Sequence, residues 1–146
     1  MAYWDTSCLL KLYVQESDSD DLEKRLELEV SIATAAIARL ELWAALRRKE
    51  AVGDIQRGEA RKSLISFDTG VAARQLTVYP FNQRVTVRFE DVIDSMYRLT
   101  PHVHLRTLDA IHLSTALEFG ETELVSTDLR LRQAALLRGL TVFPPQ

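Results

Sequence analysis

The sequence predicts an α/β fold with a central parallel β-sheet of five strands and about seven helices, arranged in three layers. Two observations favour this class. Short segments rich in β-forming residues alternate with longer segments of helical periodicity along the whole chain, and the helical segments are too long to be hairpin turns. Strands connected in this way lie parallel, and a parallel sheet is normally buried under helices on both faces. At 146 residues the chain has the length of one domain, so we expect a single domain over residues 1–146.

The individual elements follow from local composition. The strand segments are short and either apolar throughout or alternating: 1–4, 30–34, 76–79, 124–127 and 140–143. The helical segments carry helix-forming residues or apolar residues at helical spacing: 8–13, 22–26, 36–50, 55–67, 85–99, 105–119 and 130–138. Gly120 and Gly139 are expected to end the helices before them. Residues 72–74 either extend the preceding helix or form a separate turn.

The composition is that of a soluble globular protein. Hydrophobic residues make up 47% and charged residues 27%, and no apolar run is long enough to span a bilayer. The first residues show no basic leader with an apolar signal core, and the single Cys8 cannot form an internal disulfide, so we expect a cytoplasmic protein. The net charge of −3 argues against binding nucleic acid by overall attraction, but it allows a local basic rim around an acidic centre.

Two aspartates stand where predicted strands end. Asp5 follows the first strand and Asp128 follows the fourth. In an open parallel sheet, ligands bind in the crevice outside the carboxyl ends of the strands, so both side chains are candidates for a ligand site. Aspartate is also a preferred residue at a helix N-terminus, and each could simply cap the helix that follows it.

Two further acids lie within predicted helices. Glu41 has Ile37, Ala38, Ala44 and Ala45 as its helical neighbours, and Asp109 has Leu113 at i+4 and Ala116 at i+7. Both therefore face packed chain in the prediction, without an adjacent lysine or arginine. The alternative for Glu41 is an ordinary exposed helix glutamate, since alanines also face solvent.

Together these residues, called the four acids below, suggest a metal site. Two carboxylates about 5 Å apart repel by about 3 kcal/mol at an effective dielectric constant near 20, so their convergence requires a cation or raised pKa values. Oxygen ligands without histidine or cysteine favour Mg²⁺ or Mn²⁺ over Zn²⁺. Such an ion suits phosphate chemistry, because it neutralises phosphoryl oxygens and activates water. The pattern predicts a metal-dependent phosphodiester hydrolase and leaves DNA and RNA open as substrates.

The segments that carry these acids resemble the four acidic motifs of the PIN domain family, and in particular the VapC toxins of type II toxin-antitoxin systems. The similarity covers essentially the whole chain, and the motifs occur in the family's order: Asp5-Thr6-Ser7, Arg39-Leu40-Glu41-Leu42, the segment 105–113 around Asp109, and Ser126-Thr127-Asp128.

The resemblance implies a PIN-like fold and an endoribonuclease activity. The four acids would bind one or two Mg²⁺ or Mn²⁺ ions and position the water that cuts RNA. Thr6 and Ser7 match positions that support the first acid, and Ser126 matches a hydroxyl residue two places before the last. The family also implies a homodimer and inhibition by a small antitoxin that fills the acidic site, commonly with a basic side chain.

Several basic residues near the four acids in sequence are candidates for holding RNA: Lys11, Arg106, Arg130 and Arg132. Arg48 lies two turns beyond Glu41 on the same helix and could meet phosphates or an antitoxin, although the sequence favours a solvated cation at the helix C-terminus. His112 follows Asp109 by one turn, and it either bonds that acid or is a satisfied core histidine.

Two other functions remain open from the sequence. One is phosphoryl transfer through an aspartyl phosphate at Asp5, although that chemistry would want a second acid two residues later, where Ser7 stands. The other is a catalytically silent PIN-like binding module in which the acids serve as helix caps.

Overall fold

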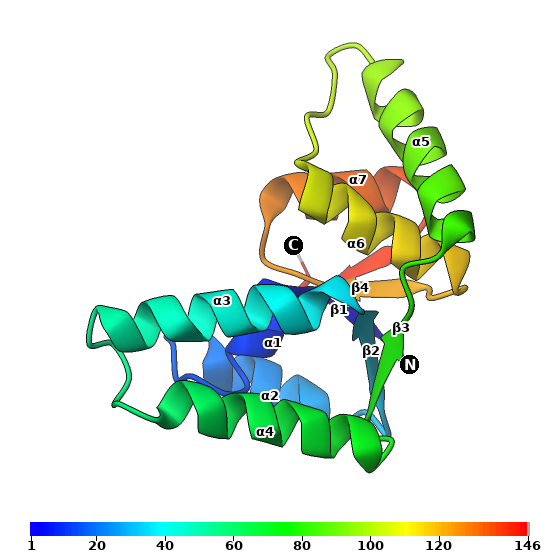
Figure 1. Cartoon of the computed structure of the whole chain (residues 1–146). Coiled ribbons are helices and arrows are strands. Elements are labelled where there is room, and N and C mark those ends of the chain that lie inside the picture. Colours follow the sequence, from blue (N-terminus) through cyan, green and yellow to red (C-terminus); the bar gives the residue numbers. More distant parts are fainter. Residues whose placement is uncertain (146) are drawn as a thin grey trace.

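The computed structural model describes residues 1–145, and Gln146 of the predicted domain lies outside the described residues. Its strands form one parallel sheet in the order β3-β2-β1-β4-β5 (Figure 1). The strand bounds are β1 Tyr3–Trp4, β2 Ile32–Ala35, β3 Leu76–Tyr79, β4 Glu123–Val125 and β5 Thr141–Phe143. The α/β class and the parallel sheet of five strands are therefore confirmed.

Seven α-helices connect and follow these strands within the described residues. They are α1 Thr6–Leu10, α2 Ser19–Glu27, α3 Ile37–Ala51, α4 Glu59–Ala72, α5 Gln83–Tyr97, α6 Thr107–Glu118 and α7 Leu129–Leu137. Figure 1 shows α1 to α4 on one side of the sheet and α5 to α7 on the other, which gives the expected three layers.

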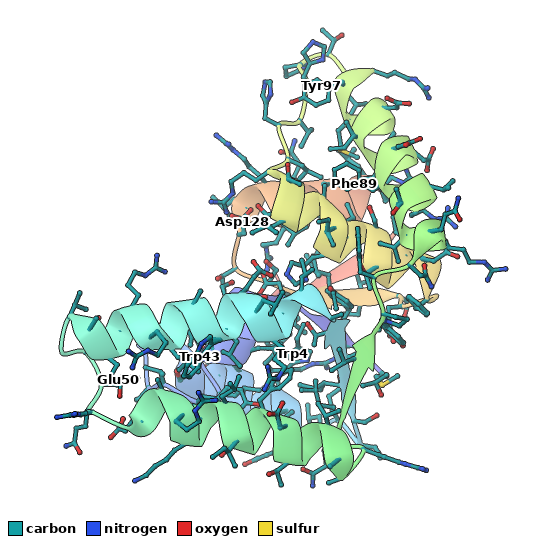
Figure 2. The ribbon with its side chains drawn as sticks, viewed as in Figure 1. Trp4, Trp43, Glu50, Phe89, Tyr97 and Asp128 are labelled. Atoms are coloured by element: carbon teal, nitrogen blue, oxygen red, sulfur yellow. The ribbon has the colours of Figure 1, made fainter. Side chains whose placement is uncertain are left out.

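Each face of the sheet has its own hydrophobic core. Adjacent strand residues point to opposite faces, so Tyr3 packs with Leu113 in the core under α5, α6 and α7, whereas Trp4 packs with Leu42 in the core under α1 to α4. Figure 2 shows Trp4 beside α3 and Phe89 among the helices of the opposite layer. Both β1 side chains are fully buried, as expected for the central strand of a doubly covered sheet.

Two details differ from the sequence-based expectation, and the alternatives left open for residues 72–74 are resolved. The first helix begins earlier, at Thr6, because Asp5 caps it, and after Leu10 it gives way to hydrogen-bonded turns. Ala72 ends α4, and Arg74 then takes a left-handed conformation (φ 60°) in the turn to β3. Apolar residues cover most of the helical surface of segment 105–119, a pattern that predicts a helix buried on all sides, but α6 is not, because Leu108 is 47% exposed.

The strand order places a topological switch between β1 and β4. From β1 the chain adds β2 and β3 on one side, and then crosses to add β4 and β5 on the other. Connections that leave in opposite directions open a crevice at the carboxyl ends of these two strands. Among residues 1–145, no helix combines the length and the apolar character needed to cross a membrane.

Candidate active site

The four acids line a single pocket of about 590 Å³ at the carboxyl ends of β1 and β4. Asp5 ends β1, Asp128 precedes α7, Glu41 lies in the second turn of α3, and Asp109 lies in the first turn of α6. Figure 2 labels Asp128 beside the start of α7, on the side that faces α3. Elements from both layers thus bring together side chains that are far apart in the sequence.

Asp5 is held by three donors. Its Oδ1 accepts from the backbone N–H of Cys8 (2.9 Å) and from the Ser7 hydroxyl (3.0 Å), and its Oδ2 accepts from the Ser126 hydroxyl. The bond to Cys8 is an N-cap, so the capping interpretation is correct and compatible with a place in the pocket. Hydrogen bonds of this kind fix the carboxylate in one orientation.

Asp128 is also both an N-cap and a pocket residue. Its Oδ1 accepts from the backbone N–H of Leu131 (2.8 Å) at the start of α7. Its own N–H donates to the Ser126 hydroxyl (3.1 Å), which in turn donates to Asp5. One buried serine therefore joins the ends of β1 and β4 across the switch point.

Glu41 is bound by neutral donors on one oxygen. Its Oε1 accepts from the Thr6 hydroxyl (2.8 Å) and lies 2.6 Å from Nε2 of His112. Burial raises the pKa of Glu41, but the hydrogen bonds from His112 and Thr6, together with the charge of Arg106, outweigh burial and leave the pKa below its usual range. The carboxylate is therefore ionised at neutral pH.

Asp109 has a basic partner, contrary to the expectation from sequence. Arg106 lies three residues earlier at the N-terminus of α6, and its Nε donates to Oδ2 of Asp109 (3.0 Å). The same guanidinium donates from Nη2 to Oδ2 of Asp128 (3.2 Å). Burial raises the pKa of Asp109 above its usual range, and Arg106 only partly opposes this effect, while the charge of Asp128 adds to it.

Comparison with known proteins fits this geometry. The sequence profile of the PIN domain matches residues 2–137. The chain belongs to the PIN domain family. It is 35% identical over 145 residues to ribonuclease VapC46 of Mycobacterium tuberculosis, which covers 98% of this chain and 96% of that protein.

Two solved structures share the fold of this PIN domain. One is VapC20 of M. tuberculosis, a sarcin-ricin loop cleaving toxin, with a TM-score of 0.69, 12% identity, and coverage of 92% of this chain and 95% of that one. The other is a toxin-antitoxin complex from Klebsiella pneumoniae, with a TM-score of 0.65, 14% identity, and coverage of 90% of both chains. At these identities the matches establish the fold alone.

The basic residues proposed from sequence occupy different environments in the PIN domain. Arg106 lines the pocket, and Arg130 is exposed in an adjoining hollow that shares Arg106, Thr127 and Asp128 with it. Arg48 also lines the pocket.

Two of the predicted RNA contacts are engaged within the protein. Lys11 pairs with Asp18 (2.5 Å) and lies outside the pocket lining. Arg132 is only 5% exposed, and its guanidinium donates to the backbone carbonyls of Ser126 (2.7 Å) and Pro144 (2.5 Å). The structure places Arg132 in the core as a clamp between β4 and the C-terminal segment, so it does not belong to a basic rim.

The chemistry of the pocket suits a hard divalent cation, although no ready-made ligand cluster is present. Within residues 1–145, no three histidine, cysteine, aspartate or glutamate side chains are grouped closely enough to hold a metal ion. The four acids nevertheless offer only oxygen ligands around one pocket. The donor set therefore fits Mg²⁺ or Mn²⁺.

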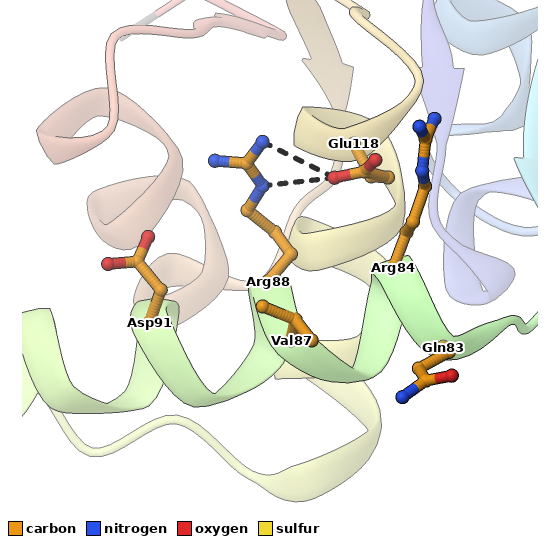
Figure 3. A pocket seen from close by; sticks show the side chains of 6 residues that line it. All are labelled: Gln83, Arg84, Val87, Arg88, Asp91 and Glu118. Carbon is orange, nitrogen blue, oxygen red and sulfur yellow. Dashed lines mark hydrogen bonds and ion pairs between the residues drawn. The ribbon is translucent and has the colours of Figure 1, made fainter.

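A second and larger pocket, of about 650 Å³, lies far from this chemistry (Figure 3). It lies along the outer face of α5, where Arg88 pairs with Glu118 of α6 (3.3 Å), and none of the four acids lines it. Its size alone does not make it a functional site, because its charged side chains are mostly paired with one another or with a neighbour: Arg88 with Glu118, and Asp91 with Arg138 of the segment after α7.

The role of His112 was not found from the sequence. It bonds Glu41 and not Asp109, and the phenol oxygen of Tyr3 lies 2.6 Å from Nδ1 of the same ring. The available signal was weak, because a polar ring at i+3 from an acid shares its helix face but does not reveal a partner on another helix.

Proposed function

We propose that this PIN domain, over residues 1–146, is a cytoplasmic endoribonuclease that hydrolyses RNA phosphodiester bonds with the help of Mg²⁺ or Mn²⁺ and acts as the toxin of a toxin-antitoxin pair. The observation that carries the proposal is the convergence of the four acids in one pocket at the switch point of the sheet. Full-length similarity to a protein named ribonuclease VapC46 supports RNA as the substrate.

We assign the ion to the four acids. A bound divalent ion would supply charge neutralisation at the phosphoryl oxygens and acidify a coordinated water. The protein's own contribution is to hold the carboxylates in place before substrate arrives: Ser7, Ser126 and the Cys8 N–H fix Asp5, while Thr6 and His112 fix Glu41. Such preorganisation avoids reorienting these dipoles during the reaction.

The same pocket offers cations for the RNA backbone. The Arg106 side chain is 72% exposed, Arg48 is exposed in the pocket lining, and Arg130 is exposed in the adjoining hollow. Guanidinium groups bind phosphate oxygens in a fork geometry, and contacts of this type position the strand without reading its bases. Arg48, Arg106 and Arg130 are therefore our candidates for orienting the scissile phosphate.

We further propose that a small antitoxin inhibits the protein by inserting a basic side chain among the four acids. Arg106 already demonstrates that a guanidinium can bridge Asp109 and Asp128 in this pocket. A homodimer is part of the same proposal. Light scattering of the purified protein tests the dimer, and a short neighbouring open reading frame that encodes a DNA-binding protein is the expected source of the antitoxin.

The decisive experiment is cleavage of synthetic RNA by purified protein with Mn²⁺. We expect Asp5→Asn and Asp109→Asn each to abolish cleavage while circular dichroism shows an intact fold. Asp54→Asn, at an exposed position outside the pocket, is the matched control and should cut like the unsubstituted protein. Undiminished cleavage by both pocket variants would reject the mechanism, and a folded parent protein that neither binds Mn²⁺ nor cuts RNA would instead indicate a silent binding module.

A further inference from the structure

Three buried or half-buried side chains form a hydrogen-bonded series that runs from β1 through α6 to α3 and ends at Glu41. Tyr3, from the central strand β1, lies 2.6 Å from Nδ1 of His112 on α6, and Nε2 of that ring lies 2.6 Å from Oε1 of Glu41 on α3. Tyr3 is fully buried, and His112 is 2% exposed. The two rings also meet edge to face, with centroids 5.8 Å apart.

The Glu41 carboxylate sets the direction of both hydrogen bonds in the series Tyr3, His112, Glu41. An ionised carboxylate only accepts hydrogen bonds, so Nε2 of His112 must carry the proton that faces Glu41. In the neutral ring Nδ1 is then an acceptor, and the phenol hydroxyl of Tyr3 donates to it. The tautomer of His112 is thus fixed by its partners on both sides, as is common for imidazoles that orient ligands of a metal.

Both donors to Glu41 act on the same oxygen. Thr6 and His112 each contact Oε1, and within residues 1–145 no hydrogen bond from the protein goes to Oε2. The second oxygen is therefore left for the pocket, which Glu41 and His112 both line. Both ring nitrogens of His112 are thus used, and the ring joins the central strand β1 to an acid on α3 in the opposite layer.

We propose that Tyr3 and His112 form a directional hydrogen-bond relay that holds Glu41 with Oε2 toward the pocket, so that His112 is a positioning residue for metal binding. The inference rests on the proposed function, because it assigns Glu41 to the ion. It adds two residues, one of them in the hydrophobic core, to the machinery of the site.

Four variants test the relay in the full-length protein. His112→Leu removes the donor to Glu41, His112→Gln supplies an amide N–H at a similar distance along the side chain, and Tyr3→Phe removes the bond that fixes the tautomer. Ser114→Ala is the matched control, since Ser114 is buried on the same helix but bonds only the Ala110 carbonyl (2.6 Å). Thermal denaturation establishes that each variant folds.

Three measurements separate positioning from simple packing. Calorimetry with Mn²⁺ alone should show an affinity about 10- to 100-fold lower for His112→Leu, the range typical of lost partners of metal ligands. His112→Gln should recover most of the affinity, Tyr3→Phe should lose part of it, and the control should match the parent. With RNA, the loss should fall mainly on kcat at saturating substrate and not on KM.

Nitrogen-15 NMR of the imidazole provides a readout that is independent of metal and RNA. The parent protein should show protonated Nε2 and unprotonated Nδ1 at His112, and Tyr3→Phe should give a mixture of tautomers. Protonated Nδ1 in the parent overturns the relay, whether or not Nε2 is protonated as well. A folded His112→Leu protein with unchanged Mn²⁺ affinity also overturns it. If the parent fails to bind Mn²⁺, the proposed function fails, but the NMR result still decides whether the relay exists. If His112→Leu does not fold, the Mn²⁺ affinities of Tyr3→Phe and His112→Gln decide whether the relay affects metal binding.

Discussion

Replacing Ser126 by alanine should destabilise the protein measurably, because one buried hydroxyl joins two strand ends. Its side chain is fully buried, donates to the Asp5 carboxylate and accepts from the N–H of Asp128. A hydrogen bond to a charged group contributes about 1.5–3 kcal/mol, and Asp5 keeps its other donors, so we expect a loss in this range. For a domain of this size each kcal/mol lowers Tm by about 2–4 °C, which gives a decrease of about 3–12 °C.

The assay is urea and thermal denaturation followed by circular dichroism in EDTA, with Ser114→Ala as control. Both serines are fully buried and both substitutions remove one hydroxyl. The Ala110 carbonyl, however, keeps its backbone partner within α6 when the Ser114 hydroxyl is removed, so this control should cost about 1 kcal/mol or less. Equal losses of stability for the two variants would refute the role assigned to Ser126.

Three further predictions concern stability and binding. Arg132→Met should destabilise the protein by several kcal/mol in denaturation experiments, since it leaves the buried carbonyl of Ser126 and the half-buried carbonyl of Pro144 without this partner. Arg130→Ala should instead weaken RNA binding in a filter assay at unchanged Tm. The pKa of Asp109 is raised on folding, so its ionisation lowers the stability of the folded protein as pH rises above about 4. Asp109→Asn should therefore raise Tm at pH 7 in EDTA, and the difference in Tm should vanish in more acidic buffer. Gly139→Ala, at φ 86°, should cost about 1 kcal/mol of stability, whereas Gly70→Ala within α4 should raise stability by about 0.5–1 kcal/mol on the same urea curves.

The fold was accessible from sequence because its signals are local. The alternation of short β-rich and longer helical segments predicts the five strands and the class, and Gly120 and Gly139 end their helices with positive φ as expected. The strand-end positions of Asp5 and Asp128 follow from the general location of ligand sites in parallel sheets. Boundaries were less accurate, since hydrogen bonds beyond the segment decide where α1 and β4 begin.

The contacts of the site were less accessible because they depend on tertiary placement. His112 and Glu41 are 71 residues apart in sequence, and only the packing of α3 and α6 around the end of β1 brings them together. Arg106 is the exception, because it stands three residues before Asp109, a spacing at which helical side chains meet, so the sequence offered this ion pair and the prediction missed it. Arg132 was assigned to RNA from its charge, but the carbonyls that bind it become neighbours only after β4 and the C-terminal segment are in place.

The partners of the four acids divide the pocket into a fixed and an exchangeable half. Asp5 and Glu41 are held by neutral donors that are buried or half-buried and belong to rigid elements. Asp109 and Asp128 share a single guanidinium on a side chain that is 72% exposed, and exposed ion pairs contribute only about 0–1 kcal/mol. A divalent ion or a partner's basic side chain would therefore replace Arg106 at Asp109 and Asp128 at little energetic cost, and a phosphate would draw Arg106 away from them at a similarly small cost. The other two carboxylates would keep the geometry that such a ligand meets.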